Sequence, residues 1–123
     1  MRVWLMALGA LAGVFGAAGV GLAAVGAHRS GSPTVTTAAY FLLFHAAGLA
    51  ALCALAQPRL DRGILIAGSL IGVGAILFSG DLALRALSNV ILVHMAAPTG
   101  GVLMILGWLV AAVALPLSFR REV

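Results

Sequence analysis

Hydrophobic residues fill four long stretches of this chain, and polar residues gather in the short segments between them. The uncharged runs cover residues 3–27, 34–56, 63–80 and 90–117. A helix needs about 20 apolar residues to cross a ~30 Å hydrocarbon core. The third run reaches that length if its helix continues past Asp81 towards Leu87. The pattern therefore predicts an all-α integral membrane protein, a bundle of four spanning helices.

The fourth run is too long for one straight span, and Pro98 inside it marks a helix start. Proline is tolerated in the first turn of a helix, where its missing N–H has no intrahelical partner. Residues 88–97 then form a loop or partial turn at the membrane surface. We expect one membrane domain over residues 1–123, with helices at about 3–28, 35–56, 63–87 and 98–118.

The first run has a second interpretation, as a cleaved signal peptide. Arg2 precedes the apolar stretch, and residues 25–27 resemble a small-residue cleavage site. The apolar region of a signal peptide usually has 7–15 residues. This run is longer and three more spans follow it, so we favour a retained helix.

Composition supports a membrane protein and argues against a nucleic-acid-binding one. Hydrophobic residues make up 63% of the 123 residues and charged residues 8%, against roughly 25% charged in soluble domains. The net charge of +4 comes from seven arginines that stand at the ends of apolar runs, and the chain has no lysine. Such a distribution indicates membrane topology. We expect the lipid bilayer as partner and no nucleic acid.

The arginines also predict orientation. Four spans place both termini on one side, and that side carries five of the seven arginines: Arg2, Arg59, Arg62, Arg120 and Arg121. The opposite side carries Arg29 and Arg85. Positive charge is enriched in cytoplasmic loops. We expect both termini to be cytoplasmic, in the inner membrane of a bacterium.

Glycines at helical spacing suggest where helices pack closely. Gly9 and Gly13 form one GxxxG pair in the first helix, and Gly68 and Gly72 form another in the third. Small residues let the backbones of lipid-solvated helices approach each other. We expect the first helix to be central and to pack within the chain. Homo-oligomer formation through the Gly-rich helices is the alternative.

His45 is the deepest ionisable residue. It lies about ten residues from either end of its helix, and so roughly 15 Å deep, near the bilayer midplane. Ionisable groups at such depth face the bundle interior or a water-filled cavity. One interpretation is a neutral imidazole that donates to a backbone carbonyl, or to a Ser or Thr of a neighbouring helix. The other is a functional group, and both stay open.

Polar side chains gather on one side of the membrane. Asp81 and Arg85 lie one helical turn apart, with Asp81 roughly 27 Å along its helix from Gly63. A simple ion pair at a helix end is one interpretation. The other is a polar pocket, open to the outer side and closed by the apolar inner half. The candidate ligand-binding residues are His28, His45, Ser79, Asp81, Arg85, His94 and Thr99.

The residue types do not favour metal or catalytic chemistry. The three histidines and Asp81 are metal-ligand types, but their spacing fits no closed metal signature, and His45 lies ~10 Å below Asp81. No nucleophile-elbow motif surrounds Ser79. Cys53 is the only cysteine, so an intrachain disulfide cannot form. We expect no catalytic residue, no metal and no cofactor.

A series of short motifs resembles a known family of small membrane proteins. In order they are Gly26-Ala27-His28, Phe44-His45-Ala46, Leu77-Phe78-Ser79-Gly80-Asp81-Leu82, Pro98-Thr99-Gly100-Gly101 and Gly107-Trp108. Together they resemble the family catalogued as domain of unknown function 423, to which the eukaryotic transmembrane protein 256 group is similar. Asp81 departs from it, since members often have Ser there. The resemblance implies a single four-helix domain in the bacterial inner membrane, without an established activity.

Two functional hypotheses follow. The first is a non-enzymatic membrane protein whose outward-facing polar pocket binds a small ligand, a lipid or a partner protein. The second is a conduit or carrier for protons or a small solute, with His45 as an intramembrane relay. On the same helix below His45, only Cys53 and Gln57 could continue such a relay.

Overall fold

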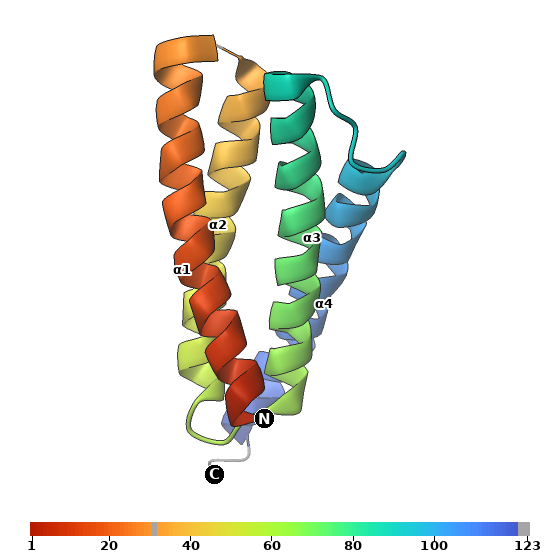
Figure 1. Cartoon of the computed structure of the whole chain (residues 1–123). Coiled ribbons are helices and arrows are strands. Elements are labelled where there is room, and N and C mark those ends of the chain that lie inside the picture. The colour runs from red at the N-terminus through yellow and green to blue at the C-terminus, as the bar shows by residue number, and fades with distance from the viewer. Residues whose placement is uncertain (31, 121–123) are drawn as a thin grey trace.

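Four helices account for nearly all of the chain in the computed structural model, which describes residues 1–30 and 32–120. They are α1 (Arg2–Val25), continued by a π-helical turn (Gly26–Ser30), α2 (Pro33–Ala56), α3 (Arg62–Ser88) and α4 (Ala96–Arg120) (Figure 1). Each helix is long and apolar enough to cross a membrane. The prediction of an all-α, four-span chain is confirmed.

Local chemistry explains where the helices begin and end. Asp61 caps α3, because its Oδ1 accepts hydrogen bonds from the backbone N–H groups of Gly63 (2.9 Å) and Ile64 (3.2 Å). At the other end of α3, Asn89 adopts the left-handed conformation (φ 54°) that stops a helix. The helix α4 begins at Ala96, two residues before Pro98, so the proline lies within the first turn.

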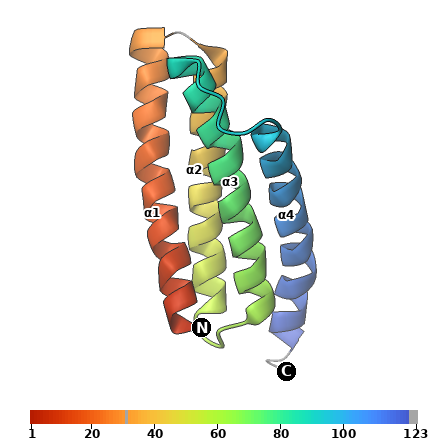
Figure 2. The same cartoon turned by 45° about the vertical axis from the view of Figure 1, so that its right-hand side comes forward.

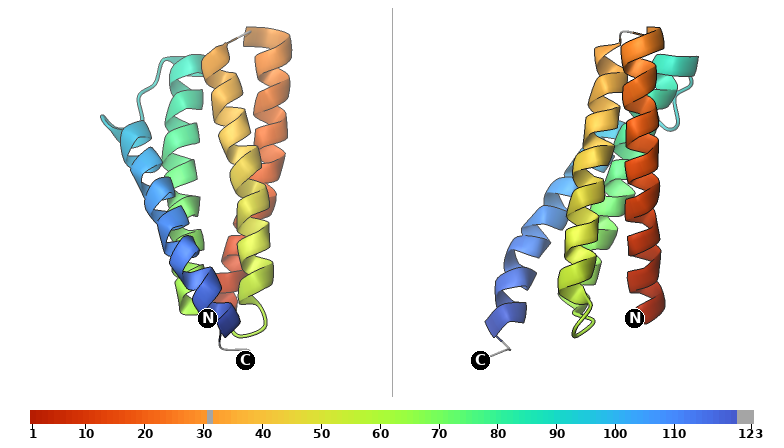
Figure 3. Two further views of the ribbon diagram at one scale, coloured as in Figure 1. Left: turned by 180° about the vertical axis from the view of Figure 1, so that it is seen from behind. Right: turned by 90° about the vertical axis from the view of Figure 1, so that its left-hand side faces the viewer.

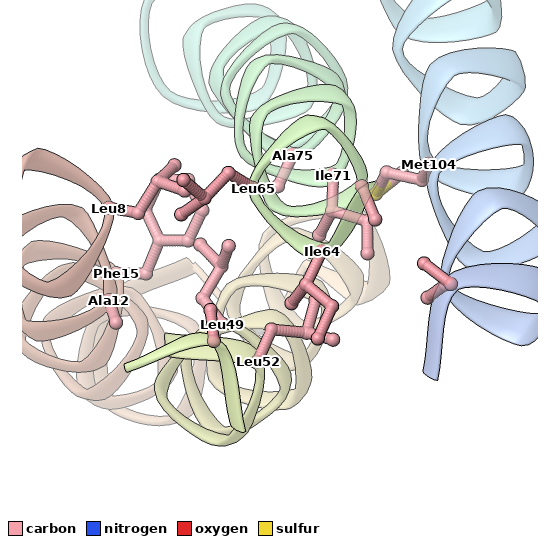
Figure 4. Packing of buried hydrophobic residues seen from close by; sticks show 14 of the residues in the cluster. Leu8, Ala12, Phe15, Leu49, Leu52, Ile64, Leu65, Ile71, Ala75 and Met104 are labelled. Carbon is pink, nitrogen blue, oxygen red and sulfur yellow. The ribbon is translucent and has the colours of Figure 1, made fainter. Parts of the chain in front are cut away.

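The helices form two antiparallel pairs. Helix α1 packs chiefly on α2, and α4 chiefly on α3, while α2 and α3 join the pairs (Figure 2). The main core cluster joins all four helices, and includes Leu8 of α1, Leu49 of α2, Leu65 of α3 and Met104 of α4 (Figure 4). Trp4 adds a polar link across the core, because its indole N–H donates to Ser69 Oγ at 2.7 Å.

The prediction that α1 is central and packs through Gly9 and Gly13 is wrong. A Cβ added at either glycine would meet nothing within 4 Å. The buried face of α1 consists of Leu8, Ala12, Phe15 and Gly19. Gly9 and Gly13 point away from that face, so α1 lies at the edge of the bundle.

Glycines do mediate close packing elsewhere. The side chains of Leu8 and Leu11 of α1 pack against Gly68 and Gly72 of α3, as expected for a small-residue face. The closest backbone approach joins α3 to α4, where a Cβ on Gly100 would lie 2.5 Å from the carbonyl oxygen of Gly74.

The two ends of the molecule differ in charge. One end holds the start of α1, the connection from α2 to α3 and the end of α4 (Figures 1 and 3). We call it the arginine end, because it carries Arg2, Arg59, Arg62 and Arg120. Arg121 and the side chain of Arg29, both counted in the sequence-based topology, lie outside the described residues. The opposite end holds the π-helical turn and the loop 89–95.

Candidate ligand-binding site

Asp81 is a fully buried carboxylate near the end of α3. Its Oδ2 lies 2.7 Å from Nε of Arg85, one helical turn further on. Its Oδ1 accepts a hydrogen bond from the backbone N–H of Leu92 at 3.3 Å. Asp81 therefore ties the loop 89–95 to α3 and holds Arg85 in place at the same time.

A cavity of about 380 Å³ opens beside this carboxylate. We call it the Asp81 groove, and it lies between the first turn of α2, the end of α3, the following loop and the first turn of α4. Its lining consists of Thr34, Asp81, Leu82, Arg85, His94, Met95, Ala97 and Pro98. The structure thus brings together three of the residues proposed from sequence, Asp81, Arg85 and His94.

The groove combines an apolar lining with one charged donor. Arg85 pairs with Asp81 through Nε, and its side chain is 42% exposed. A guanidinium has five N–H donors in a planar fork that suits carboxylate and phosphate oxygens. His94 and Thr34 add side chains that can donate hydrogen bonds. This arrangement can hold a small molecule that presents an acidic group to Arg85 and an apolar part to Leu82 and Met95.

His45 does not line this groove. Its Nδ1 lies 2.7 Å from the carbonyl oxygen of Phe41, and its Nε2 accepts a hydrogen bond from the indole N–H of Trp108 at 3.3 Å. Both contacts are satisfied by a neutral ring protonated at Nδ1. Gly48 makes room for the indole, because a Cβ there would lie 2.9 Å from Trp108. The neutral, hydrogen-bonded interpretation fits: His45 donates to the carbonyl oxygen of Phe41 on its own helix, and Trp108 of α4 donates to His45.

The remaining candidates lie apart from the groove. His28 and Thr99 are exposed, and neither lines the cavity. Ser79 is completely buried, and its hydroxyl has no hydrogen-bond partner among the described residues. Sequence reasoning missed Thr34, since nothing in the sequence indicated that the first turn of α2 lies beside the end of α3.

Metal ligands do not cluster in the described part of the chain. Among residues 1–30 and 32–120, no group of three or more His, Cys, Asp or Glu side chains could hold one ion.

Comparison with known proteins places this geometry in a family. The family model described as "Protein of unknown function (DUF423)" matches residues 22–101. The chain belongs to the DUF423 family. The match contains every residue that lines the Asp81 groove, together with Gly74 and Gly100 at the contact between α3 and α4. No solved structure matches this DUF423 chain.

A second cavity of the DUF423 chain lies at the other end of the molecule from the Asp81 groove. At the arginine end, about 820 Å³ of space lies between residues 59–63 and the second half of α4. The helix α4 contributes Leu106, Leu109, Val110, Val113, Ala114 and Leu117 to its lining. This space exists because α4 packs on α3 and leaves much of its other surface uncovered.

Proposed function

We propose that this DUF423 protein is a non-enzymatic, multi-pass protein of the bacterial inner membrane that binds a small amphipathic molecule in the Asp81 groove. The observation that carries the proposal is the pairing of buried Asp81 with half-exposed Arg85 at the groove wall. The pair fixes the guanidinium beside an apolar lining. A ligand with a carboxylate or phosphate group and a short apolar part has the matching chemistry.

The size and lining of the groove support a ligand of this kind. Small-molecule sites are typically concave, ~300–1,000 Å³ in volume and mostly apolar, with a few placed polar groups. The Asp81 groove has about 380 Å³, and Arg85, His94 and Thr34 are its polar groups beside Asp81. Because Asp81 already binds Arg85, the donor is positioned before a ligand arrives, which lowers the entropy cost of binding.

Binding without catalysis is the activity that we assign to the groove. Asp81 is the carboxylate of the groove; it is fully buried, with Oδ2 beside Arg85 Nε and Oδ1 accepting from the N–H of Leu92. A general base needs an oxygen that can reach a proton of the substrate. We therefore propose no catalytic residue and no cofactor.

The arginines support an orientation with both termini in the cytoplasm. Arg2, Arg59, Arg62 and Arg120 lie at one end of the molecule, in the pattern typical of cytoplasmic loops. In this orientation the Asp81 groove lies at the periplasmic side.

The carrier hypothesis has no structural support. His45 lines neither cavity, and both ring nitrogens have partners. We expect His45→Leu to leave proton flux unchanged in proteoliposomes that contain the purified protein. A fall in flux in this variant would restore the relay model.

The binding proposal can be tested with octanoate as an acidic amphipathic probe. We expect purified protein in a neutral detergent to bind octanoate in preference to octyltrimethylammonium, a cation with the same chain length, when both are titrated by calorimetry. Arg85→Gln removes the charge-assisted donor, so the octanoate affinity should fall about tenfold or more.

Arg120→Gln is the matched control, because Arg120 lies at the far end of α4 from the groove. It should leave the Arg85-dependent binding intact. Equal binding of the two probes, or equal affinities of the wild type and Arg85→Gln, would contradict the proposal.

A further inference from the structure

The larger cavity has an apolar wall that follows α4. Leu106, Leu109, Val113 and Leu117 occupy successive turns of one helix face, and all four are 45% or more exposed. Eleven residues separate the first from the last, which at 1.5 Å per residue gives roughly 16 Å. This is about half of a ~30 Å hydrocarbon core, and so the depth of one leaflet.

The rim of the same cavity is positively charged. Arg59, Asp61 and Arg62 line it at the start of α3. Asp61 Oδ1 accepts the two capping hydrogen bonds from Gly63 and Ile64, so this oxygen is directed at the backbone of α3. Arg59 Nη1 donates to the carbonyl oxygen of Ser118 at 3.3 Å, and Arg62 is exposed. The arginines therefore stand where the apolar wall ends.

We propose that this cavity is a binding site for one anionic phospholipid of the surrounding leaflet. Its phosphate lies against Arg62, and one acyl chain lies along the α4 face from Leu117 to Leu106. Charge complementarity at the rim and the one-leaflet length of the wall select this occupant. An arginine near the membrane surface attracts an anionic lipid by about 1 kcal/mol, which corresponds to about fivefold in affinity.

This site is separate from the Asp81 groove. The two cavities have no lining residue in common, and Arg62 and Arg85 lie at opposite ends of α3. The family match ends at Gly101, so it includes the rim but not the apolar wall.

The test compares an anionic phospholipid with a zwitterionic one that has the same acyl chains. Delipidated protein is incubated with phosphatidylglycerol and phosphatidylcholine of the same acyl chains, and bound lipid is counted by native mass spectrometry. We expect the wild type to retain phosphatidylglycerol preferentially, and Arg62→Gln to lower that preference about fivefold.

Arg2→Gln is the control for charge, because Arg2 is an exposed arginine of the same end that does not line the cavity. It should keep the preference. If both variants lost the phosphatidylglycerol preference equally, the preference would come from the overall positive charge of this end and the proposal would be overturned. The absence of any preference in the wild type would also overturn it.

A second experiment locates the acyl chain. Phosphatidylglycerol with a photoreactive group in one acyl chain should crosslink to residues 106–117, and Leu109→Trp should reduce the yield by filling the cavity. Ile105→Trp is the control, since Ile105 is 62% exposed on α4 but does not line the cavity. Crosslinks spread evenly over α1 and α4, or a protein dimer that covers this face, would overturn the assignment. Arg85→Gln tests ligand binding in the Asp81 groove, so that proposal and the lipid-site proposal can fail independently.

Discussion

At the scale of single residues, Asp81 makes two contacts that shape the groove, an ion pair with Arg85 and a hydrogen bond with the backbone of Leu92. One oxygen holds the loop 89–95 through Leu92, and the other holds Arg85. A buried carboxylate is tolerated when it is paired and hydrogen-bonded. The same residue therefore determines the shape of the groove and the position of its charged donor.

Asp81→Ala should loosen the loop without unfolding the helices. Loss of the Leu92 hydrogen bond removes about 1 kcal/mol, so amide exchange at Leu92 should become about fivefold faster. Hydrogen–deuterium exchange in detergent measures this. Asp81→Asn keeps an acceptor oxygen and should largely preserve protection of Leu92, while it releases Arg85. Equal exchange rates in the wild type and Asp81→Ala would show that the carboxylate does not anchor the loop.

The contact between His45 and Trp108 should contribute to stability as a pair. Side-chain hydrogen bonds between membrane helices average ≈ 0.6 kcal/mol and reach about 1.7 kcal/mol in double-mutant cycles. We expect a coupling energy in that range for His45→Phe combined with Trp108→Phe. Reversible unfolding of both single variants and the double variant measures it. Additive effects would mean that the bond at 3.3 Å adds no stability.

The sequence predicted part of the site because polar residues are rare in this chain. Asp81 and Arg85 share a helix face by their spacing alone, and His94 lies in the loop that begins soon after. The remaining candidates needed information on neighbouring helices. His45 could not be assigned from sequence, since its partner Trp108 is 63 residues away on a helix whose rotation the pattern leaves undetermined.

At the scale of the helices, the α3–α4 contact depends on glycines that leave no room for a side chain. A Cβ at Gly100 would lie 2.5 Å from the carbonyl oxygen of Gly74 and 2.6 Å from the backbone nitrogen of Phe78. Both are backbone atoms, which cannot turn aside as a flexible side chain does. The two helices would have to separate.

Gly100→Ala should therefore lower the free energy of unfolding by about 1–3 kcal/mol or more. Gly13→Ala is the matched control, because it has open space and gains helix propensity, so it should be neutral or stabilising by up to ~1 kcal/mol. Thermal unfolding in detergent compares the two. A large destabilisation by Gly13→Ala, together with loss of a dimer, would instead indicate that a second copy covers α1.

Hydropathy predicted which helices exist, but not which helices touch. Four apolar runs bounded by arginines, glycines and prolines are enough to place four spans. Partner choice depends on which face of each helix is buried, and these helices are apolar on all sides. Gly9 and Gly13 resemble Gly68 and Gly72 in sequence, yet only the second pair receives side chains from another helix.

At the scale of the whole molecule, the unequal distribution of arginines makes orientation testable. We expect the connection from α2 to α3 to be cytoplasmic and the loop 89–95 periplasmic. In a Cys53→Ala background, a membrane-impermeant maleimide should label Val93→Cys in cells with a permeabilised outer membrane, and Gln57→Cys only after the inner membrane is opened too. Both positions are exposed in the structure. The reverse labelling pattern would invert the assigned topology.

The attachment of α4 mainly to α3 bears on how the protein is made. Most residues of the core cluster belong to α1, α2 and α3, which are synthesised before α4, and α4 adds Met104, Ala111 and Ala114. A nascent chain can therefore bring its first three helices together, and tie Leu92 to Asp81, while its last segment is still inside the ribosome. The helices then assemble in the order of their synthesis, and α4 packs last, on helices that have already come together.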